Sequence, residues 1–412
     1  YFPRIPLGYD FTAILTEEPF YSLRPQVKKA TLSFMILGLT YFIRSRAAFS
    51  LWGGYLLVNI ISVNMRLADR DIPYAAWGDQ HLGACIAFVL GIFWIGRQHW
   101  WRIVRNAFGA GSETTYRLTF WIAVGGTTVM FLWLLVVGVQ AWMAGLIIAF
   151  ILMAHLVVAR VVAESGLPFY RADIAASQIY SQLPISSLTG RDVYFAGVFN
   201  ALGPLTSRDS VLTFATTGLG ICGGAELAAR ERRRLGLVIT WALAAGLVMS
   251  AVATLYCQYS YPTPMMADSR PPRNYFGAER IPDRELRQPV VNFVQGRFEQ
   301  KTHSVPLHIG IGFAVTALLE VASLRWASWP LLPIGYVASH GAFIANSWFS
   351  IFVGWIAKVL IVRFGGARLF ETLRPLFVGM IFGEALAAGV WLLINALVVI
   401  SGGESQPIRF LP

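Results

Sequence analysis

Charged side chains inside apolar runs are the residues of this sequence best suited to chemistry. Arg160 and Glu164 lie four residues apart near the end of one such run, so a helix would place both on one face and pair their charges. His155 lies five residues before Arg160 and need not share that face. A charged group at the centre of a bilayer costs about 2.5 to 3.5 kcal/mol, so each of these groups needs a partner or water.

The segment after Glu164 brings backbone groups to the same place. Gly166 and Pro168 are expected to end the helix and to expose its last carbonyls beside Arg160 and Glu164. Three interpretations follow: an interfacial salt bridge that anchors the helix end, a polar element in a solute pathway, or a metal site. The metal site has the least support, because one histidine and one carboxylate without close partners form a weak ligand set.

Three further ionisable residues, Glu320, Lys358 and Glu384, each stand alone in a separate apolar run. We expect Lys358 to meet Glu320 or Glu384 across helices, because an isolated charge inside a membrane needs a partner. Such a pair would either hold helices together or serve as the proton-coupling site of a carrier. The predicted substrate or ion pathway therefore consists of His155, Arg160, Glu164, Gly166, Pro168, Glu320, Lys358 and Glu384.

The sequence contains none of the common motifs for catalysis or cofactor binding. There is no HExxH, no CxxC pair, no phosphate-binding glycine motif and no Ser/His/Asp order. We therefore predict no enzymatic activity, no metal site and no cofactor. His81 and His340 flank apolar runs and are expected to be packing residues, and Cys85, Cys222 and Cys257 to be buried free thiols.

The composition is typical of an integral membrane protein. Residues 118–159 contain no formally charged side chain, which is enough for two bilayer spans joined by a tight turn near Gly138. Of all residues 56% are hydrophobic and 13% charged, whereas soluble domains carry about 25% charged residues. A hydrocarbon core about 30 Å thick needs about 20 apolar residues as helix, because a helix satisfies its own backbone hydrogen bonds.

Hydropathy and helix-breaking residues predict an all-α, polytopic transmembrane helix bundle with about nine or ten membrane segments. The expected spans lie near residues 28–44, 47–65, 80–97, 116–138, 140–162, 235–256, 307–326, 345–363 and 375–400. Re-entrant or broken helices are expected near 165–230 and 329–345. Irregular backbone at membrane depth must be buried in protein or line a wet cavity, so 165–230 is expected to mark a functional pathway, with a peripheral cap as the alternative.

The chain is expected to form one lateral assembly. Its parts are an extramembrane N-terminal segment 1–27, a first transmembrane bundle 28–256, a polar extramembrane loop 257–306, C-terminal transmembrane spans 307–401 and a tail 402–412. Because the chain opens without an initiator Met or a signal-peptide pattern, we expect an internal start. Within the polar loop, residues 283–301 are predicted to form a surface helix.

The net charge of +11 is explained by the bilayer as partner. Lys and Arg cluster at the ends of apolar runs, where they meet anionic headgroups, and most of the basic loops fall on one side, which should be cytoplasmic. Nucleic acid is not an expected partner, because no basic face with interleaved aromatic residues lies outside the membrane segments.

Three strings resemble a known family. They are Ala48–Leu57, Ala163–Pro168 and Val362–Phe370, the last followed by Pro375–Gly379. They resemble an uncharacterised bacterial family of multi-spanning membrane proteins that is loosely related to the oligopeptide-transporter superfamily. The resemblance implies a transporter-like architecture in the bacterial cytoplasmic (inner) membrane. It also implies that this chain corresponds to the C-terminal two-thirds of a family member, with further N-terminal spans or an N-terminal partner chain.

Two functions remain open at this point. The first is a secondary carrier for a small polar or peptide-like solute, which uses the broken region 165–230 and the embedded charges. The second is a non-transporting membrane subunit that anchors a larger complex. A carrier would have a water-accessible cavity that reaches Arg160 and Glu164, whereas in an anchoring subunit these two side chains would be packed dry.

Overall fold

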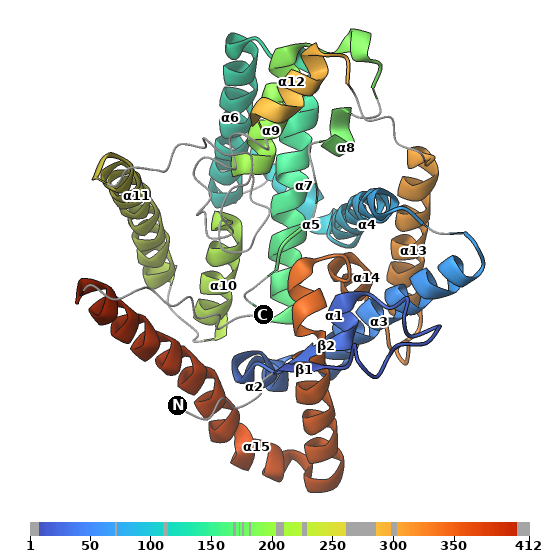
Figure 1. Cartoon of the computed structure of the whole chain (residues 1–412). Helices are drawn as coiled ribbons and strands as arrows, with labels where there is room; N and C mark the ends of the chain where they lie inside the picture. The colour runs from blue at the N-terminus through green and yellow to red at the C-terminus, as the bar shows by residue number, and fades with distance from the viewer. Residues whose placement is uncertain are drawn as a thin grey trace.

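The computed structural model is an all-α protein, which confirms the predicted fold class (Figure 1). It describes residues 8–401 except 71, 110–113, 168–169, 173, 175–176, 181–182, 203–209, 225–228, 261–285 and 298–302. Within these residues the only strands are β1 (Gly8–Asp10) and β2 (Lys29–Thr31), which pair antiparallel with Gly8 opposite Thr31.

Long apolar helices form the frame of the molecule. They are α3 (Ser45–Leu67), α4 (Tyr74–Ile95), α6 (Thr114–Val137), α7 (Ala141–Ser165), α11 (Ala229–Ser260), α13 (Val305–Arg325) and α15 (Ala342–Ile400). By length and composition, these 7 helices of the described chain could each cross a membrane. Their apolar surfaces indicate an integral membrane protein. The expected pair of spans in residues 118–159 is confirmed as α6 and α7, with a positive φ of 95° at Gly138 between them.

The helix α7 lies at the centre of the core (Figure 1). Its buried side chains include Met143, Ala154 and Val157, which have no exposed surface. They pack in one apolar cluster with buried residues of α3 and α4, such as Leu51 and Phe88. Burial of apolar side chains at this density fixes α7 against its neighbours, so the end of α7 that carries Arg160 and Glu164 has a defined position.

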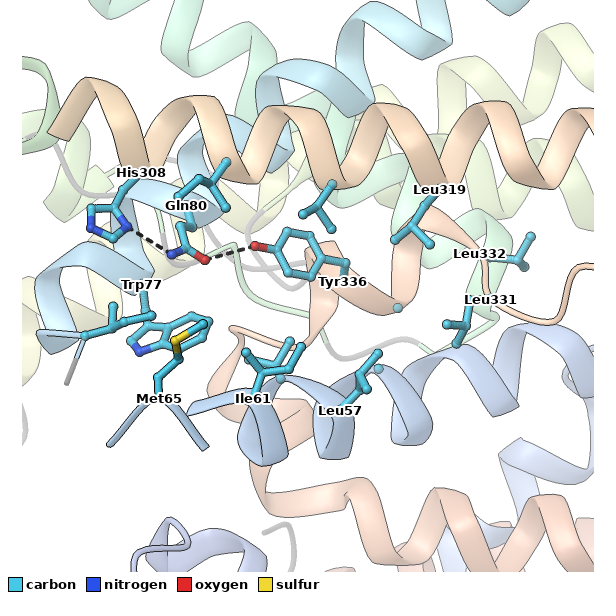
Figure 2. A pocket seen from close by; sticks show the side chains of 16 residues that line it. Leu57, Ile61, Met65, Trp77, Gln80, His308, Leu319, Leu331, Leu332 and Tyr336 are labelled. Carbon is cyan, nitrogen blue, oxygen red and sulfur yellow. Dashed lines mark hydrogen bonds between the residues drawn. The ribbon is translucent and has the colours of Figure 1, made fainter. Parts of the chain in front are cut away.

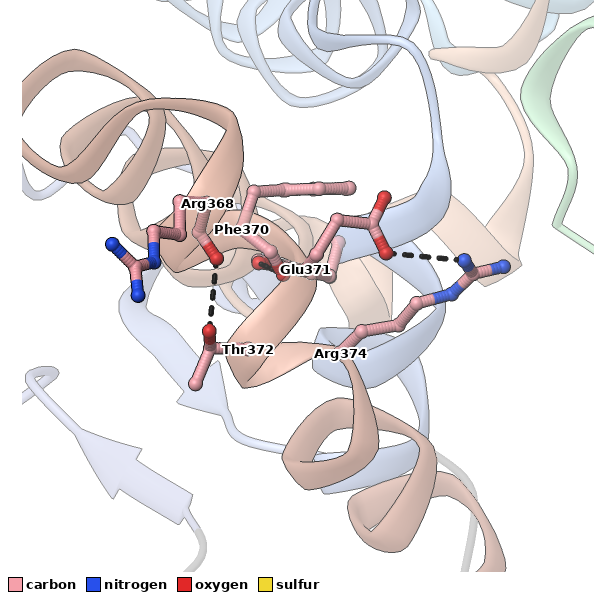
Figure 3. A network of polar contacts seen from close by, with 6 residues as sticks. Arg368, Phe370, Glu371, Thr372 and Arg374 are labelled. Carbon is pink, nitrogen blue, oxygen red and sulfur yellow. Dashed lines mark hydrogen bonds and ion pairs between the residues drawn. The ribbon is translucent and has the colours of Figure 1, made fainter.

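The helix α15 is two membrane-length arms joined at a sharp bend (Figure 1). The bend is at Gly366, whose φ of 63° and ψ of −163° lie outside the helical region and favour glycine. The sequence predicts two spans here, 345–363 and 375–400, and the basic connection between them is helical as well. Figure 3 shows this connection, where the Arg374 guanidinium lies 3.3 Å from the Glu371 carboxylate at the surface.

Short elements connect the long helices. They are α1 (Pro25–Lys28), α2 (Phe34–Phe42), α5 (Arg97–Ala107), α8 (Ser177–Tyr180), the 3-10 helix η1 (Ile185–Ser187), α9 (Gly190–Leu202), α10 (Val211–Gly224), α12 (Gln288–Val294) and α14 (Pro333–Ala338). The broken helices expected near 165–230 and 329–345 are therefore present, as α8, α9 and α10 and as α14. The expected surface helix in 283–301 is present only as α12.

The expected span near residues 28–44 is wrong. This segment forms β2 and then α2, and the nine residues of α2 are about 14 Å long, less than half of the bilayer core. Its apolar residues are instead buried against α15: the Tyr41 ring stacks on Phe370 and Phe377, with ring centroids 4.6 Å and 3.7 Å away. The Tyr41 hydroxyl also donates a hydrogen bond to the Phe370 carbonyl at 2.8 Å.

Two charged side chains of α15 cap the two ends of α2. At its start, the Glu384 carboxylate accepts a hydrogen bond from the Met35 amide at 2.6 Å and one from the Ser33 hydroxyl, whose oxygen lies 3.1 Å from both carboxylate oxygens. At its end, the Lys358 ammonium donates to the Ile43 carbonyl at 2.5 Å. An anion at the start and a cation at the end complement the helix dipole, each contributing about 0.3 to 2 kcal/mol.

These contacts correct the expectation that Lys358 pairs with Glu320 or Glu384. No ion pair joins Lys358 to either carboxylate within the described part of the chain. The Lys358 and Glu384 side chains instead bond backbone groups at the ends of α2, because inside a membrane these groups have no water to bond. Lys358 and Glu384 are therefore structural partners of α2.

Removing the Glu384 carboxylate is expected to destabilise the protein, because the Met35 amide would lose its acceptor. We expect Glu384→Ala to lower the free energy of unfolding by about 1 to 3 kcal/mol, measured as a fall in Tm in detergent micelles. Glu371→Ala is the matched control. The Glu371 side chain is 63% exposed, and its surface pair with Arg374 contributes about 0.2 to 1 kcal/mol. Equal losses in the two variants would contradict the capping role of Glu384.

Candidate functional site

The helices α4 and α13 run side by side in the same direction, in close backbone contact. Their parallel course follows from the pairs Asp79 with His303, Gln80 with Gly312 and Gly91 with Glu320. A side chain at Gly312 would lie 1.8 Å from the Gln80 carbonyl oxygen, so only glycine fits there. The starts of the two helices form one end of the candidate site, and Gly91 and Glu320 mark the other.

A cavity of about 260 Å³ lies between α3, α4, α13 and α14 (Figure 2). Most of its wall is apolar. The lining residues are Gly54, Leu57, Val58, Ile61, Met65, Ile72, Trp77, Gln80, His308, Ile311, Val315, Leu319, Leu331, Leu332, Gly335 and Tyr336. Ligand sites for small molecules are commonly apolar cavities of about 300 to 1,000 Å³ with a few placed polar groups, so this cavity suits a small solute.

Three polar side chains stand together on the cavity wall (Figure 2). The Tyr336 hydroxyl donates to the Gln80 Oε1 atom at 3.1 Å, and the Gln80 Nε2 atom lies 3.0 Å from His308 Nδ1. Because an amide nitrogen only donates, His308 Nδ1 must be the acceptor, which places the hydrogen of a neutral ring on Nε2. The polar part of the wall is thus fixed by its own hydrogen bonds.

Four of the six histidines form two ring pairs at or next to this wall. His303 lies 2.8 Å from the buried Asp79 carboxylate, and its ring is 5.3 Å from that of His308. The rings of His81 and His340 stack at 5.2 Å with an angle of 17°. His81 and His340 were expected to be separate packing residues, and no sequence signal brings them together, since more than 250 residues separate them.

A charged cluster lies at the other end of α13. Arg160 and Glu164 form the predicted ion pair at the end of α7. Glu320 lies within electrostatic range of both, and its carboxylate sits directly over the Cα atom of Gly91. The cluster therefore contains two carboxylates and one guanidinium, so one negative charge is unbalanced when all three groups are ionised. The sequence indicated Arg160 with Glu164, but not that Glu320 joins them.

The other predicted pathway residues near the end of α7 have separate roles. His155 Nδ1 lies 3.2 Å from the Ser210 hydroxyl just before α10, so its ring is not part of the Arg160 cluster. Gly166 ends α7 with a positive φ of 68°, and its amide donates to the Val162 carbonyl at 2.8 Å. Pro168 lies outside the described residues.

No metal or cofactor site can be assigned from the geometry. Among the described residues, no group of three or more His, Cys, Asp or Glu side chains is placed to hold a metal ion. Cys85 is a buried free thiol whose Sγ atom lies 3.5 Å from His81 Nε2. The chemistry that the arrangement supports is binding by shape and hydrogen bonds, with charge compensation at Glu320.

The fold and the site define a helical integral membrane protein with a small, mostly apolar cavity and a cluster of charged side chains near the ends of α7 and α13. A family model described as a family of unknown function (DUF6785) matches residues 1–405, and the chain belongs to this family. No curated protein and no solved structure matches the chain. The match agrees with the resemblance to an uncharacterised family, and it brings no link to the oligopeptide-transporter superfamily.

The contact of Glu320 with Gly91 generates a stability prediction. A methyl group at Gly91 would meet only the end of the flexible Glu320 side chain, so Gly91→Ala is expected to displace the carboxylate and to leave Tm nearly unchanged. Gly83→Ala is the matched comparison on the same helix. Its methyl group would lie 2.0 Å from the Ile309 carbonyl oxygen and is expected to cost about 1 to 3 kcal/mol. If Gly91→Ala were as destabilising as Gly83→Ala, Glu320 would be rigidly held against α4.

Proposed function

We propose that this protein is a secondary carrier in the bacterial cytoplasmic membrane, which binds a small solute in the cavity between α3, α4, α13 and α14. The single observation that carries this proposal is the cavity itself, whose wall includes the broken helix α14. Arg160 and Glu164 do not line this cavity, so the proposed solute site is not at the ion pair where the sequence placed it. In many carriers, interrupted helices line the solute site near the middle of the membrane.

The chemistry of the wall narrows the class of solute. An apolar lining with one hydrogen-bonded group of Gln80, His308 and Tyr336 suits a solute with an apolar body and a single polar end. A peptide backbone would need several donors and acceptors along its length, because each unpaired buried polar group costs about 1 to 3 kcal/mol. The proposed solute is therefore amphipathic, in place of the polar or peptide-like solute expected from the sequence.

The charged cluster at Glu320 is the proposed coupling site. Uptake of one proton by either carboxylate would neutralise the unbalanced charge of Arg160, Glu164 and Glu320. α13 carries Glu320 on one face and the cavity residues on the adjacent face. A shift of this helix would therefore change the charged cluster and the cavity at once. Proton uptake and solute binding can thus be linked through one rigid element.

The alternative function is a non-transporting membrane subunit of a larger complex. One observation favours it: side chains along α11 are exposed over its whole apolar length, for example Trp241 at 74% and Leu247 at 75%. In an assembly, a second membrane chain or additional N-terminal spans would cover this face. The two functions differ in whether the cavity opens to both sides of the membrane.

Cysteine labelling tests this difference without knowledge of the solute. In a variant with the three native cysteines replaced by alanine, Val315→Cys places a thiol in the cavity wall. A carrier that alternates between two states is expected to be labelled by a membrane-impermeant maleimide added to either side of proteoliposomes. In the proton-coupled carrier, a pH gradient is expected to change the labelling of Val315→Cys. Glu320→Gln keeps the size of the side chain and removes its titration, so labelling should no longer depend on the gradient.

Val129→Cys on α6 is the control, because this side chain is 67% exposed in the middle of an apolar helix and should face lipid. It should react from neither side. Reaction of Val315→Cys from one side only, or from neither, would exclude a carrier and favour the anchoring subunit.

A further inference from the structure

A half-buried arginine without a carboxylate partner lies next to the cavity. The Arg24 guanidinium stacks over the Trp77 ring, 5.8 Å from its centroid, and Trp77 also lines the cavity. Arg24 forms no ion pair with any residue of the described chain. A guanidinium that is held in place but has no counter-charge is a ready site for an anion.

A buried polar atom near Trp77 also lacks a partner. The His340 ring lies 6.0 Å from the Trp77 ring, and within the described residues the His340 Nε2 atom has no hydrogen-bond partner. Buried polar groups are normally paired, so such atoms need an explanation, and an absent ligand is one.

The ring of His340 is oriented by its other nitrogen. His340 Nδ1 lies 3.1 Å from the Tyr336 carbonyl, which can only accept, so the hydrogen of the neutral ring is on Nδ1. His340 Nε2 can then donate to an anion only after it takes up a proton. The charged and titratable groups that face this ring are Arg24, His81 and Tyr336.

We propose that Arg24 and His340 bind the carboxylate of an amphipathic monoanion whose apolar chain occupies the cavity. The Trp77 ring connects the two parts, since it lies 6.0 Å from the His340 ring and also forms part of the cavity wall. One guanidinium balances one negative charge, and the Arg fork matches both oxygens of a carboxylate. The anion is accompanied by one proton on His340. This inference rests on the proposed function in one respect, the use of the cavity as the binding site for the apolar part of the ligand.

Equilibrium binding of radiolabelled octanoate to the purified protein in nanodiscs tests the proposal, with octanol as the uncharged probe. Arg24→Gln is expected to weaken octanoate binding about tenfold or more and to leave octanol binding unchanged. Arg97→Gln is the matched control, because Arg97 stacks on Trp94 at 5.0 Å, far from the cavity at the end of α4. Unchanged octanoate affinity in Arg24→Gln would overturn the anion site, whereas absence of octanol binding would overturn the cavity.

One further variant tests the role of His340. The native protein should bind octanoate more tightly at pH 6 than at pH 8, and His340→Gln should remove this difference. Displacement of bound octanoate by short-chain phosphatidylglycerol at concentrations far below those needed with unlabelled octanoate would show that the site prefers a lipid headgroup and would overturn the proposal.

Discussion

Broken helices inside a membrane depend on side chains from other helices, because the backbone groups at their ends have no water to bond. In this protein α15 supplies both caps of α2, through Glu384 and Lys358. α3 supplies one such contact before α14, where the Ser50 hydroxyl accepts a hydrogen bond from the Leu332 amide at 2.8 Å. The wall of the cavity includes α14, so this contact helps to hold the proposed solute site in place.

The need to bond backbone groups at helix ends also separates charged side chains with a structural role from those available for function. Lys358 and Glu384 are committed to backbone groups, whereas the cluster around Glu320 keeps an unbalanced charge. α13 joins this cluster to the cavity. Its cavity residues recur in steps of three and four, from His308 to Leu319, and Glu320 follows on the adjacent face toward α4 and α7. His308 and Glu320 are about 18 Å apart along the helix, so α13 can transmit a shift between them.

Much of the fold follows from local sequence patterns. The spans predicted at 47–65, 116–138 and 140–162 are confirmed because length, apolar content and breaker residues are local properties. The prediction at 28–44 was wrong because the uncharged stretch Ala30–Ile43 is only 14 residues long, shorter than a bilayer core needs. The partners of the Tyr41 ring of α2, Phe370 and Phe377, lie more than 300 residues away and cannot be read from this run.

The site was less predictable, for the same physical reason. The spacing of Arg160 and Glu164 predicts their ion pair, because both lie on one helix. The stacking of His81 on His340 depends on tertiary packing, which the sequence does not display. The sequence also favoured 165–230 as the functional region, whereas the cavity is lined by the other broken piece, α14. Both regions contain Pro and Gly, and only the packing of α3, α4 and α13 decides which one borders a cavity.

In the proposed carrier, α13 moves relative to α3 when the charge at Glu320 is neutralised. Spin labels at Leu318→Cys on α13 and Ile60→Cys on α3, both exposed positions, report the distance across the cavity by pulsed EPR in nanodiscs. The account predicts two distance populations whose ratio changes between pH 5 and pH 8 and stays constant in Glu320→Gln. A single distance that is the same at both pH values would contradict it.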